Sequence, residues 1–374
     1  MKTVRAVSCK LLLCSLLAIP LVGVILTSAE AADYRVETVA DGLEHPWALA
    51  FLPDGRMLVT ERAGRLRLID QDGLHPEPIS GLPEVHVHSQ AGLFHILPAQ
   101  DAGNTVYLTL VEGDRRENTL SLIRARLMDH ALEDVEVLFR ATPWRDTSVH
   151  YGGRMVWLND RSLLLTLGDG FDYRYRAQQP EDHFGSVLRL DADGRARPDN
   201  PFAGLNDARR PETWTIGHRN VQGVALDPET GEIWASEHGP RGGDRLHRLQ
   251  AGGNYGWPIT AHARDYSGAE ITPYQTYPGM QDPLYVWDRA IAPAGLAVYR
   301  GDMFPQWNGD LLVPGLVSRA VHRLRVDGDR VTEEERLFTS LDRRIRAVEV
   351  GPDGALYLLT DHSSGEMLRI VPSP

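Results

Sequence analysis

The sequence predicts an all-β protein, and more closely a six-bladed β-propeller with four-stranded antiparallel blades. Three observations support this prediction. A unit of apolar run, tight turn, second apolar run and loop recurs six times, no long stretch has helical periodicity, and 35 glycines and 24 prolines supply many turns. Units of this kind most naturally close into a ring, because closure leaves few sheet edges exposed.

The units differ mainly in the length of their loops. They begin at Trp47, Ala91, Gly153, Gln222, Ala294 and Arg346, so the spacing between successive starts varies from 44 to 72 residues. The stretch YRVETVADGL, from Tyr34, is predicted to supply the strand that completes the last blade. An array of two-sheet sandwiches is the alternative, which we favour less because sandwiches rarely repeat one turn signature so regularly.

The N-terminus has the pattern of an export signal. It combines a basic start, an apolar stretch from Leu11 to Leu26 and small residues before a cut, so residues 1–31 are predicted to be a signal peptide. Residues 32–374 would then form one catalytic propeller domain. This predicts a periplasmic or secreted protein with no stable membrane insertion after cleavage, although an uncleaved anchor is also open because the apolar stretch is rather long.

Composition excludes several kinds of chemistry. Both cysteines, Cys9 and Cys14, lie in the predicted signal peptide, so the mature chain would have no disulfide, thiolate nucleophile or cysteine-bound zinc. No lysine follows Lys10, which excludes Schiff-base chemistry and a phosphate-loop lysine. The formal net charge of -12 argues against nucleic acid as a partner.

The stretch VHYGGR contains a candidate general base. His150 is followed by two glycines, which let a ligand or backbone approach closely, and a histidine there can accept a proton near neutral pH. Nineteen residues later, TLGDG places Asp169 at the end of the next predicted strand, where it would orient the imidazole. The alternative is a strand cap and an ordinary turn.

Two further stretches suggest an anionic, planar ligand. In GHRNVQG, Arg219 and Asn220 precede a blade and suit a planar ligand with oxygen atoms, unless the loop is simply solvated. In RRIRAVEV, Arg344 and Arg346 alternate and therefore point to one face of a strand. Two like charges on that face favour an anion, with a solvated edge as the alternative.

The stretch EHGPRGGD, residues 237–244, is unusually rich in charge and backbone freedom for a turn. The carbonyl groups of Gly239 and Pro240 are well suited to a hard cation, and Asp244 adds a carboxylate, so a calcium site or a plain loop is predicted. In HVHSQAGL, His86 and His88 are a weak zinc pair because no third ligand is evident, whereas Gln90 just precedes a blade.

Taken together and in this order, these motifs resemble the PQQ-dependent aldose sugar dehydrogenases, within the soluble quinoprotein glucose and sorbosone dehydrogenases. The similarity covers nearly the whole mature chain. It includes HPWALAFLPDGRMLVTERAGRL, SQAGL, HYGGR, TLGDG, IGHRNVQG, SEHGPRGGD, GGNYGWP, GDLLVPGL and RIRAVEVGPDGALYLLTD. The resemblance implies a six-bladed propeller that binds pyrroloquinoline quinone (PQQ) and Ca²⁺ at the mouth of its channel.

The resemblance also assigns roles at the reacting centre. His150 matches the general base that takes the proton from the anomeric hydroxyl, and Asp169 and Gln90 match groups that support that site. Arg219 and Asn220 match residues that contact the quinone oxygens.

The other matched positions concern the cofactor and its metal. Arg344 and Arg346 match arginines that face the cofactor carboxylates, and His238 matches a cofactor-binding position. The backbone carbonyls of Gly239 and Pro240 match ligands of the cofactor-bound calcium. Asp244 and Tyr255 match positions near a second, structural calcium.

Four positions depart from the family pattern. Val149 stands where an aspartate precedes the base, Val317 stands in place of a cofactor-contacting lysine, and Ala290 stands in place of a threonine. Arg319 is near Val317 and is a candidate substitute for the lysine. Arg245 replaces a glutamate, which weakens the prediction of the structural calcium.

The function predicted from the sequence is a periplasmic, PQQ- and calcium-dependent dehydrogenase that oxidises aldose sugars at C1 to lactones. Its electrons would pass to an external acceptor, a cytochrome or a quinone. Two alternatives stay open: a calcium-dependent propeller lactonase, which would need carboxylates or amides converging on a channel metal, and a non-catalytic ligand-binding propeller.

Overall fold

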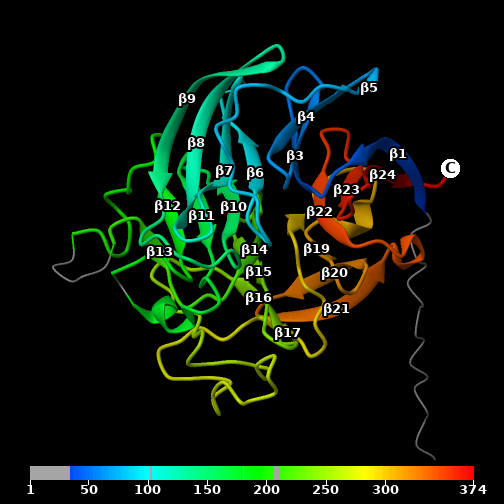
Figure 1. The fold of residues 1–374 in the computed structure, drawn as a ribbon. Coiled ribbons are helices and arrows are strands. Elements are labelled where there is room, and N and C mark those ends of the chain that lie inside the picture. Colours follow the sequence, from blue (N-terminus) through cyan, green and yellow to red (C-terminus); the bar gives the residue numbers. More distant parts are fainter. Residues whose placement is uncertain (1–33, 102, 180, 205–209) are drawn as a thin grey trace, which may run out of the picture. The chain divides into compact units, whose positions relative to one another are not determined.

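The computed structural model describes residues 34–374 except 102, 180 and 205–209, and the predicted signal peptide lies outside this part of the chain. The described residues form six four-stranded antiparallel sheets, which follow one another around a ring (Figure 1). The predicted six-bladed propeller is therefore confirmed. The only helices in the described part are three short 3₁₀ turns, none of which is long or apolar enough to cross a bilayer.

The first three blades are consecutive in sequence. The first contains β2 (Pro46–Phe51), β3 (Met57–Glu61), β4 (Arg65–Asp70) and β5 (Gly73–Leu74). The second contains β6 (Leu93–Pro98), β7 (Thr105–Gly113), β8 (Asn118–Met128) and β9 (Ala131–Arg140). The third contains β10 (Gly152–Trp157), β11 (Leu163–Leu167), β12 (Val187–Leu190) and β13 (Thr213–Thr215), with the 3₁₀ turn η1 (Arg174–Gln178) between β11 and β12.

The remaining blades carry the longest connections. The fourth contains β14 (Val221–Leu226), β15 (Ile233–Glu237), β16 (Asp244–Arg248) and β17 (Tyr285–Trp287). The fifth contains β18 (Ala297–Val298), η2 (Pro305–Trp307), β19 (Leu311–Gly315), β20 (Ala320–Asp327) and β21 (Arg330–Leu337). The sixth follows η3 (Thr339–Leu341) and contains β22 (Ile345–Val350), β23 (Leu356–Thr360) and β24 (Gly365–Pro372).

The sixth blade is completed by the strand predicted from the N-terminal stretch. β1 (Tyr34–Leu43) pairs antiparallel with β24, from Tyr34 opposite Pro372 to Leu43 opposite Gly365. The sheet order β1-β24-β23-β22 joins the first and last strands of the described chain in one blade. This pairing closes the ring by backbone hydrogen bonds.

Hydrophobic patterning explains which strands lie inside each blade. Every residue of β11 is buried, and its sequence LLLTL is almost continuously apolar, as expected for a strand covered on both faces. The outer strand β21 instead alternates exposed and partly exposed residues along most of its length, RVTEEERL, as expected for a solvated blade edge.

One buried arginine connects most of the blades at the channel. The guanidinium of Arg154, on β10, donates to the carbonyl oxygens of Gln222 (3.0 Å), Trp47 (3.3 Å), Arg346 (3.3 Å) and Ala294. It also stacks over the Trp47 ring at 3.9 Å from the ring centroid. These carbonyls belong to four other blades, so one fork of donors ties five blades together.

The loops that lead into the six inner strands share a backbone feature. Each contains a residue with positive φ: His45 (47°), Ser89 (54°), His150 (53°), Gly217 (79°), Ala292 (53°) and Asp342 (46°). Only one of these six is glycine, although L side chains disfavour this region. Strained residues of this kind often occur at functional sites, and four of them, His45, Ser89, His150 and Ala292, belong to or adjoin the site described below.

Candidate active site

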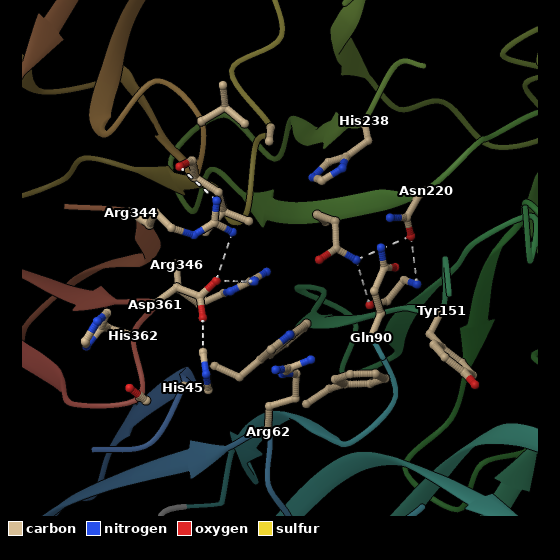
Figure 2. Close-up of a pocket in the computed structure, with 18 residues that line it drawn as sticks. His45, Arg62, Gln90, Tyr151, Asn220, His238, Arg344, Arg346, Asp361 and His362 are labelled. Carbon is tan, nitrogen blue, oxygen red and sulfur yellow. Dashed lines mark hydrogen bonds and ion pairs between the residues drawn. The ribbon is translucent and has the colours of Figure 1, made fainter. Parts of the chain in front are cut away.

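A cavity of about 550 Å³ opens where the loops before the inner strands converge. Its walls come from widely separated blades, and Figure 2 shows their side chains directed toward a common space. One side carries Arg344, Arg346 and Asp361, and another carries Gln90 and Asn220. This volume is within the usual range of about 300–1,000 Å³ for small-molecule sites.

The basic side of the cavity is organised around one carboxylate. Asp361 Oδ2 accepts from Arg344 at 3.2 Å and from Arg346 at 3.0 Å, while its Oδ1 lies 2.8 Å from His45 Nδ1. Burial alone would raise the pKa of Asp361, but the charge of Arg346 and the hydrogen bond from His45 outweigh burial and hold it well below its usual range. The two predicted arginines are therefore brought together and held in fixed positions.

A third guanidinium gives the cavity an excess of positive charge. Arg62 lines the same cavity and donates to the carbonyl oxygen of Ser89, and within the described residues it has no ion-pair partner. Among the lining residues, three arginines therefore oppose the single carboxylate of Asp361. Such a wall favours a ligand with several negative charges.

The amide side of the cavity fixes the loop before β10. The side-chain oxygen of Gln90 accepts from the backbone N–H of His150 at 2.9 Å. The side-chain oxygen of Asn220 accepts from the backbone N–H of Gly152 at 3.1 Å. Gln90 and Asn220 thus position the segment that carries the predicted base, as well as lining the cavity.

His150 and Asp169 form the predicted pair. His150 Nδ1 lies 2.7 Å from Asp169 Oδ1, and both side chains are buried. Burial lowers the pKa of His150, with the hydrogen bond to Asp169 opposing it, so the imidazole is neutral near pH 7. Because an ionised carboxylate only accepts, Nδ1 carries the proton and Nε2 keeps its lone pair, and Nε2 has no hydrogen-bond partner among the described residues.

Asp169 is itself held firmly in place. Its Oδ2 accepts from the indole N–H of Trp257 at 2.8 Å, and its Oδ1 also accepts from the backbone N–H of Phe171 at 2.8 Å. Burial would raise the pKa of Asp169, but the hydrogen bond and charge of His150 outweigh burial and lower it. Asp169 is therefore ionised and fixes the tautomer of His150.

Arg219 lies in a small recess with Asp169 rather than on the wall of the main cavity. Its guanidinium donates to the carbonyl oxygen of His238 at 3.3 Å and lies 5.5 Å from the ring centroid of Trp257. Its backbone N–H donates to Glu237 at 3.1 Å. The predicted cofactor contacts of Arg219 and Asn220 therefore come from adjacent residues with different surroundings.

His238 lines the cavity as an unprotonated side chain. Burial and the nearby charge of Arg219 lower the pKa of His238 to about 3. Its Nε2 lies 2.7 Å from the carbonyl oxygen of Pro293, which only accepts, so Nε2 donates and Nδ1 is the acceptor. His238 can thus accept a hydrogen bond from a ligand in the cavity.

The loop 239–243 has two carbonyl groups available for a cation. Gly239 and Pro240 are both buried, and within the described residues neither carbonyl oxygen accepts a hydrogen bond. Asp244 holds the loop from behind, because its carboxylate accepts from the backbone N–H groups of Gly239 (2.8 Å), Ile291 (2.7 Å) and Ala292 (2.8 Å). Because Gly239 and Pro240 also line a pocket, carbonyl oxygens without a hydrogen-bond partner are available to a cation there, in keeping with the predicted metal contact.

The structure does not bring Asp244 and Tyr255 together as metal ligands. Both oxygens of Asp244 are occupied as described, and the Tyr255 hydroxyl donates to the Arg248 carbonyl at 2.9 Å. Arg245 places its guanidinium 2.7 Å from Glu237 and 3.4 Å from the Tyr255 carbonyl. The buried Arg245 thus supplies positive charge beside Glu237 and Tyr255, where a cation would otherwise do so. The second calcium stays a prediction that these contacts do not favour.

The remaining histidines offer little to a metal. His218, Glu237 and His247 form a buried group of metal-binding type, but Arg245 already pairs with Glu237. The rings of His86 and His88 are 6.3 Å apart, and no such three-residue group includes them in the described part of the chain. The weak zinc prediction gains no support.

Two of the departures from the family pattern, Val317 and Ala290, line the site. Val317 is 57% exposed and lines the main cavity, and Ala290 lines an adjoining outer pocket. Arg319 lines neither pocket, and its exposed guanidinium pairs with Asp342 at 2.8 Å, so the structure gives no support for Arg319 as a substitute for the lysine. Arg62 is the arginine without a carboxylate partner that lines the cavity instead.

Sequence reasoning missed four residues of the basic wall. His45, Arg62, Asp361 and His362 all line the cavity. His45 lies just before β2, in HPW, and Arg62 lies just after β3, in TERAG. Asp361 and His362 lie just after β23, in TDHSS. A search for polar residues at the strand ends, repeated over all six units, would have found them.

The lowered pKa of the buried His247 side chain predicts how the free energy of unfolding depends on pH. Burial lowers the pKa of His247 to about 4, although the hydrogen bond to Glu237 opposes it. Its unfolded pKa is near 6.5, so the unfolded state takes up a proton first and stability is lost as pH falls from about 6.5 to 4. In urea unfolding, His247→Gln should therefore lose less stability over this window, by up to about 1.4 kcal/mol per pH unit. Equal pH slopes for the two proteins would contradict this assignment.

Comparison with known proteins is consistent with this geometry. Residues 43–369 match the glucose/sorbosone dehydrogenase family. Aldose sugar dehydrogenase from Escherichia coli is 39% identical over 352 residues, which covers 92% of this chain and 94% of the relative. The crystal structure of the E. coli enzyme in its apo-form has a TM-score of 0.87 and covers 91% of this chain and 100% of that structure.

Two other solved structures extend the comparison. A glucose dehydrogenase is 42% identical with a TM-score of 0.87, over 91% of this chain and 100% of that structure. An aldose sugar dehydrogenase from Streptomyces coelicolor in its PQQ-bound form is 26% identical with a TM-score of 0.74, over 91% of this chain and 99% of that structure. The chain therefore belongs to the glucose/sorbosone dehydrogenase family.

Proposed function

We propose that this protein is a PQQ- and calcium-dependent dehydrogenase that oxidises aldose sugars at C1 to lactones. The observation that carries the proposal is the buried His150–Asp169 pair, whose separation of 2.7 Å leaves Nε2 of a neutral imidazole without a partner. The cationic cavity and the relatives that are aldose and glucose dehydrogenases support the same function.

The residues present fit a planar tricarboxylate cofactor. The main cavity offers the guanidinium groups of Arg62, Arg344 and Arg346, which suit carboxylates, and the side chains of Asn220 and His238, which suit ring nitrogen and oxygen atoms. The PQQ-bound form of the S. coelicolor relative supports this cofactor. Val317 removes one cationic contact that the family resemblance implies, and Arg62 supplies another.

The same fit test supports calcium. The carbonyl oxygens of Gly239 and Pro240, which accept no hydrogen bond within the described residues, are the kind of ligands that would hold Ca²⁺. When bound, the quinone would accept the hydride from the sugar, and the metal would polarise the quinone.

The protein's own groups perform the proton transfer. Nε2 of His150 accepts the proton of the anomeric hydroxyl as the hydride leaves C1, which produces the lactone carbonyl. Asp169 stabilises the imidazolium that forms, because its carboxylate already accepts the Nδ1–H. Arg219, positioned through its backbone N–H on Glu237, adds positive charge close to this pair.

The proposal also includes a cellular location and a redox partner. We propose a periplasmic or secreted enzyme on the basis of residues 1–31, which have the pattern of a cleavable signal peptide. Electrons would leave for an external acceptor, a cytochrome or a quinone, because an oxidised cofactor must be regenerated after each turnover.

A reconstitution assay tests the proposed function. The mature apo-protein is incubated with Ca²⁺ and PQQ, and aldoses are offered with an artificial redox dye. We expect dye reduction that requires both additions. If PQQ does not bind even at high concentration, the dehydrogenase is excluded, and hydrolysis of lactones by the calcium-loaded protein then distinguishes a lactonase from a non-catalytic propeller.

A further inference from the structure

A buried arginine contacts the backbone of the predicted base. Arg145, in the connection between β9 and β10, is only 6% exposed. Its Nη1 donates to the carbonyl oxygens of His150 (3.0 Å) and Val149 (3.3 Å). Within the described residues its side chain forms no ion pair, although arginines buried this deeply are almost always paired with a carboxylate.

On the basis of the proposed function, we infer that Arg145 is a positioning residue for His150. The two carbonyl groups that it binds belong to the peptide groups on either side of the His150 Cα. By holding both, the guanidinium fixes the direction in which Nε2 points and keeps a positive charge next to the imidazole.

The backbone of His150 needs such a contact. Its φ is 53°, a region that L side chains disfavour. Gln90 already holds its N–H at 2.9 Å, and Asp169 holds its Nδ1 at 2.7 Å. The only other donor to its carbonyl oxygen in the described part of the chain is the backbone N–H of Gly170, at a long 3.4 Å. Arg145 therefore secures the third polar group of His150.

Arg145 is itself held by the second blade. Its backbone N–H donates to the carbonyl oxygen of Asn118, the first residue of β8, at 2.9 Å, and its own carbonyl oxygen accepts from the Asn118 N–H at 2.8 Å. The guanidinium carbon lies 3.7 Å from the ring centroid of Tyr151, within the range of a cation–π contact. Tyr151 lines the main cavity (Figure 2), and its hydroxyl donates to the Asn118 side chain at 2.6 Å.

Two glycines leave room for this arrangement. Gly168 and Gly170 flank Asp169 in TLGDG. A Cβ atom at Gly168 would lie 2.2 Å from the His150 carbonyl oxygen, and one at Gly170 would lie 3.1 Å from Nη1 of Arg145. A side chain at either position would displace the carbonyl or crowd the guanidinium, so both glycines serve the contact.

The charge of Arg145 acts on the same imidazole. Burial lowers the pKa of His150, the hydrogen bond to Asp169 opposes it, and the charges of Arg219 and Arg145 lower it further. His238 also interacts with His150 but carries no charge near pH 7. Burial lowers the pKa of Arg145 to about 10, so its guanidinium is charged near pH 7. A positive charge here favours the neutral imidazole, which can accept a proton and releases it readily after turnover.

The test follows His150 directly. NMR of the apo-protein with labelled histidines gives the pH at which the imidazole titrates, and its signal is the one missing from His150→Ala. Arg145→Gln and Arg145→Met, which remove the charge, should raise this pH by about 0.5–1 pH unit, whereas Arg145→Lys, which keeps the charge, should not. The Gln and Lys variants decide the question even if the Met variant does not fold.

The second readout is turnover in the protein loaded with Ca²⁺ and PQQ. Arg145→Met should lower kcat for aldoses by about 10- to 100-fold, because a base that points in the wrong direction reacts slowly. KM and the affinity for PQQ should change little, since Arg145 lines neither the main cavity nor the outer pocket.

The same changes at Arg323 are the matched control. Arg323 is 4% exposed, pairs with Asp310 and Glu333 in the fifth blade and lines neither pocket, so its loss should affect stability alone. The inference is overturned if His150 titrates at the wild-type pH in Arg145→Gln, if Arg145→Lys and Arg145→Gln shift it equally, or if the Arg323 changes do the same. Wild-type protein that binds no PQQ would instead overturn the proposed function, and the NMR titration would still show whether Arg145 acts on His150.

Discussion

Replacing His150 with alanine will lower dye-linked oxidation of aldoses by about 10²–10⁴-fold, the usual contribution of a positioned general base. PQQ binding should be little affected, because the basic wall of Arg62, Arg344, Arg346 and Asp361 does not depend on the imidazole. The two quantities are measured separately, the rate by dye reduction and the affinity by titration of the apo-protein in Ca²⁺.

The controls for this prediction distinguish a base from a structural histidine. His130 is exposed on the turn between β8 and β9, so His130→Ala should leave the rate unchanged. Asp169→Asn should lower the rate strongly as well, because an amide no longer specifies the proton on Nδ1. An unchanged rate in His150→Ala, with cofactor bound, would show that another group accepts the proton.

The pH dependence of the wild-type rate follows from the same pair. Burial lowers the pKa of His150, with Asp169 opposing it, and the base must be neutral to accept a proton. We therefore expect the acid limb of kcat/KM to lie below about 6.5, the ordinary pKa of histidine. An acid limb above this value would contradict the assignment of His150 as the base.

Replacing Arg154 with methionine will strongly lower the free energy of unfolding. Methionine keeps much of the volume but removes every donor, which leaves the carbonyl oxygens of Trp47, Gln222, Ala294 and Arg346 without the guanidinium at the channel. A buried polar group without its partner costs about 1–3 kcal/mol. We expect a total loss of roughly 3–5 kcal/mol in the free energy of unfolding, measured by urea denaturation of the apo-protein.

An exposed arginine provides the comparison for this loss. Arg126, on the outer part of the second blade, pairs with Glu133 and Asp134 while its side chain is 46% exposed. Its replacement by methionine should change stability by about 0.5 kcal/mol at most. If Arg154→Met were equally mild, the carbonyl contacts at the channel would not hold the blades together.

The repeated units in the sequence predicted the blades well because inner strands are buried on both faces. The predicted start at Trp47 falls in β2, and the one at Arg346 falls in β22. The strand from Tyr34 was also correctly assigned to the last blade. The strands themselves are local in sequence, so patterning could reveal them, whereas the pairing of β1 with β24 joins distant parts of the described chain.

The site was harder to predict, because its contacts join distant parts of the chain. His45 and Asp361 are 316 positions apart, yet they share a hydrogen bond. Neither stands out in its own stretch, whereas His150 and Asp169 did, only 19 positions apart. Arg154 was similarly missed because its role depends on carbonyls from four other blades, which no local pattern contains.

The pairing of β1 with β24 has a consequence for biosynthesis. A ribosome releases the chain from its N-terminus, so Tyr34–Leu43 emerges long before its pairing partner, Gly365–Pro372. Any chain that stops early keeps an open strand edge in its sixth blade, and such edges invite aggregation and proteolysis. Ring closure thus distinguishes a chain that contains Gly365–Pro372 from a shorter one by its structure. Proteases can therefore degrade the shorter chain before it binds a cofactor.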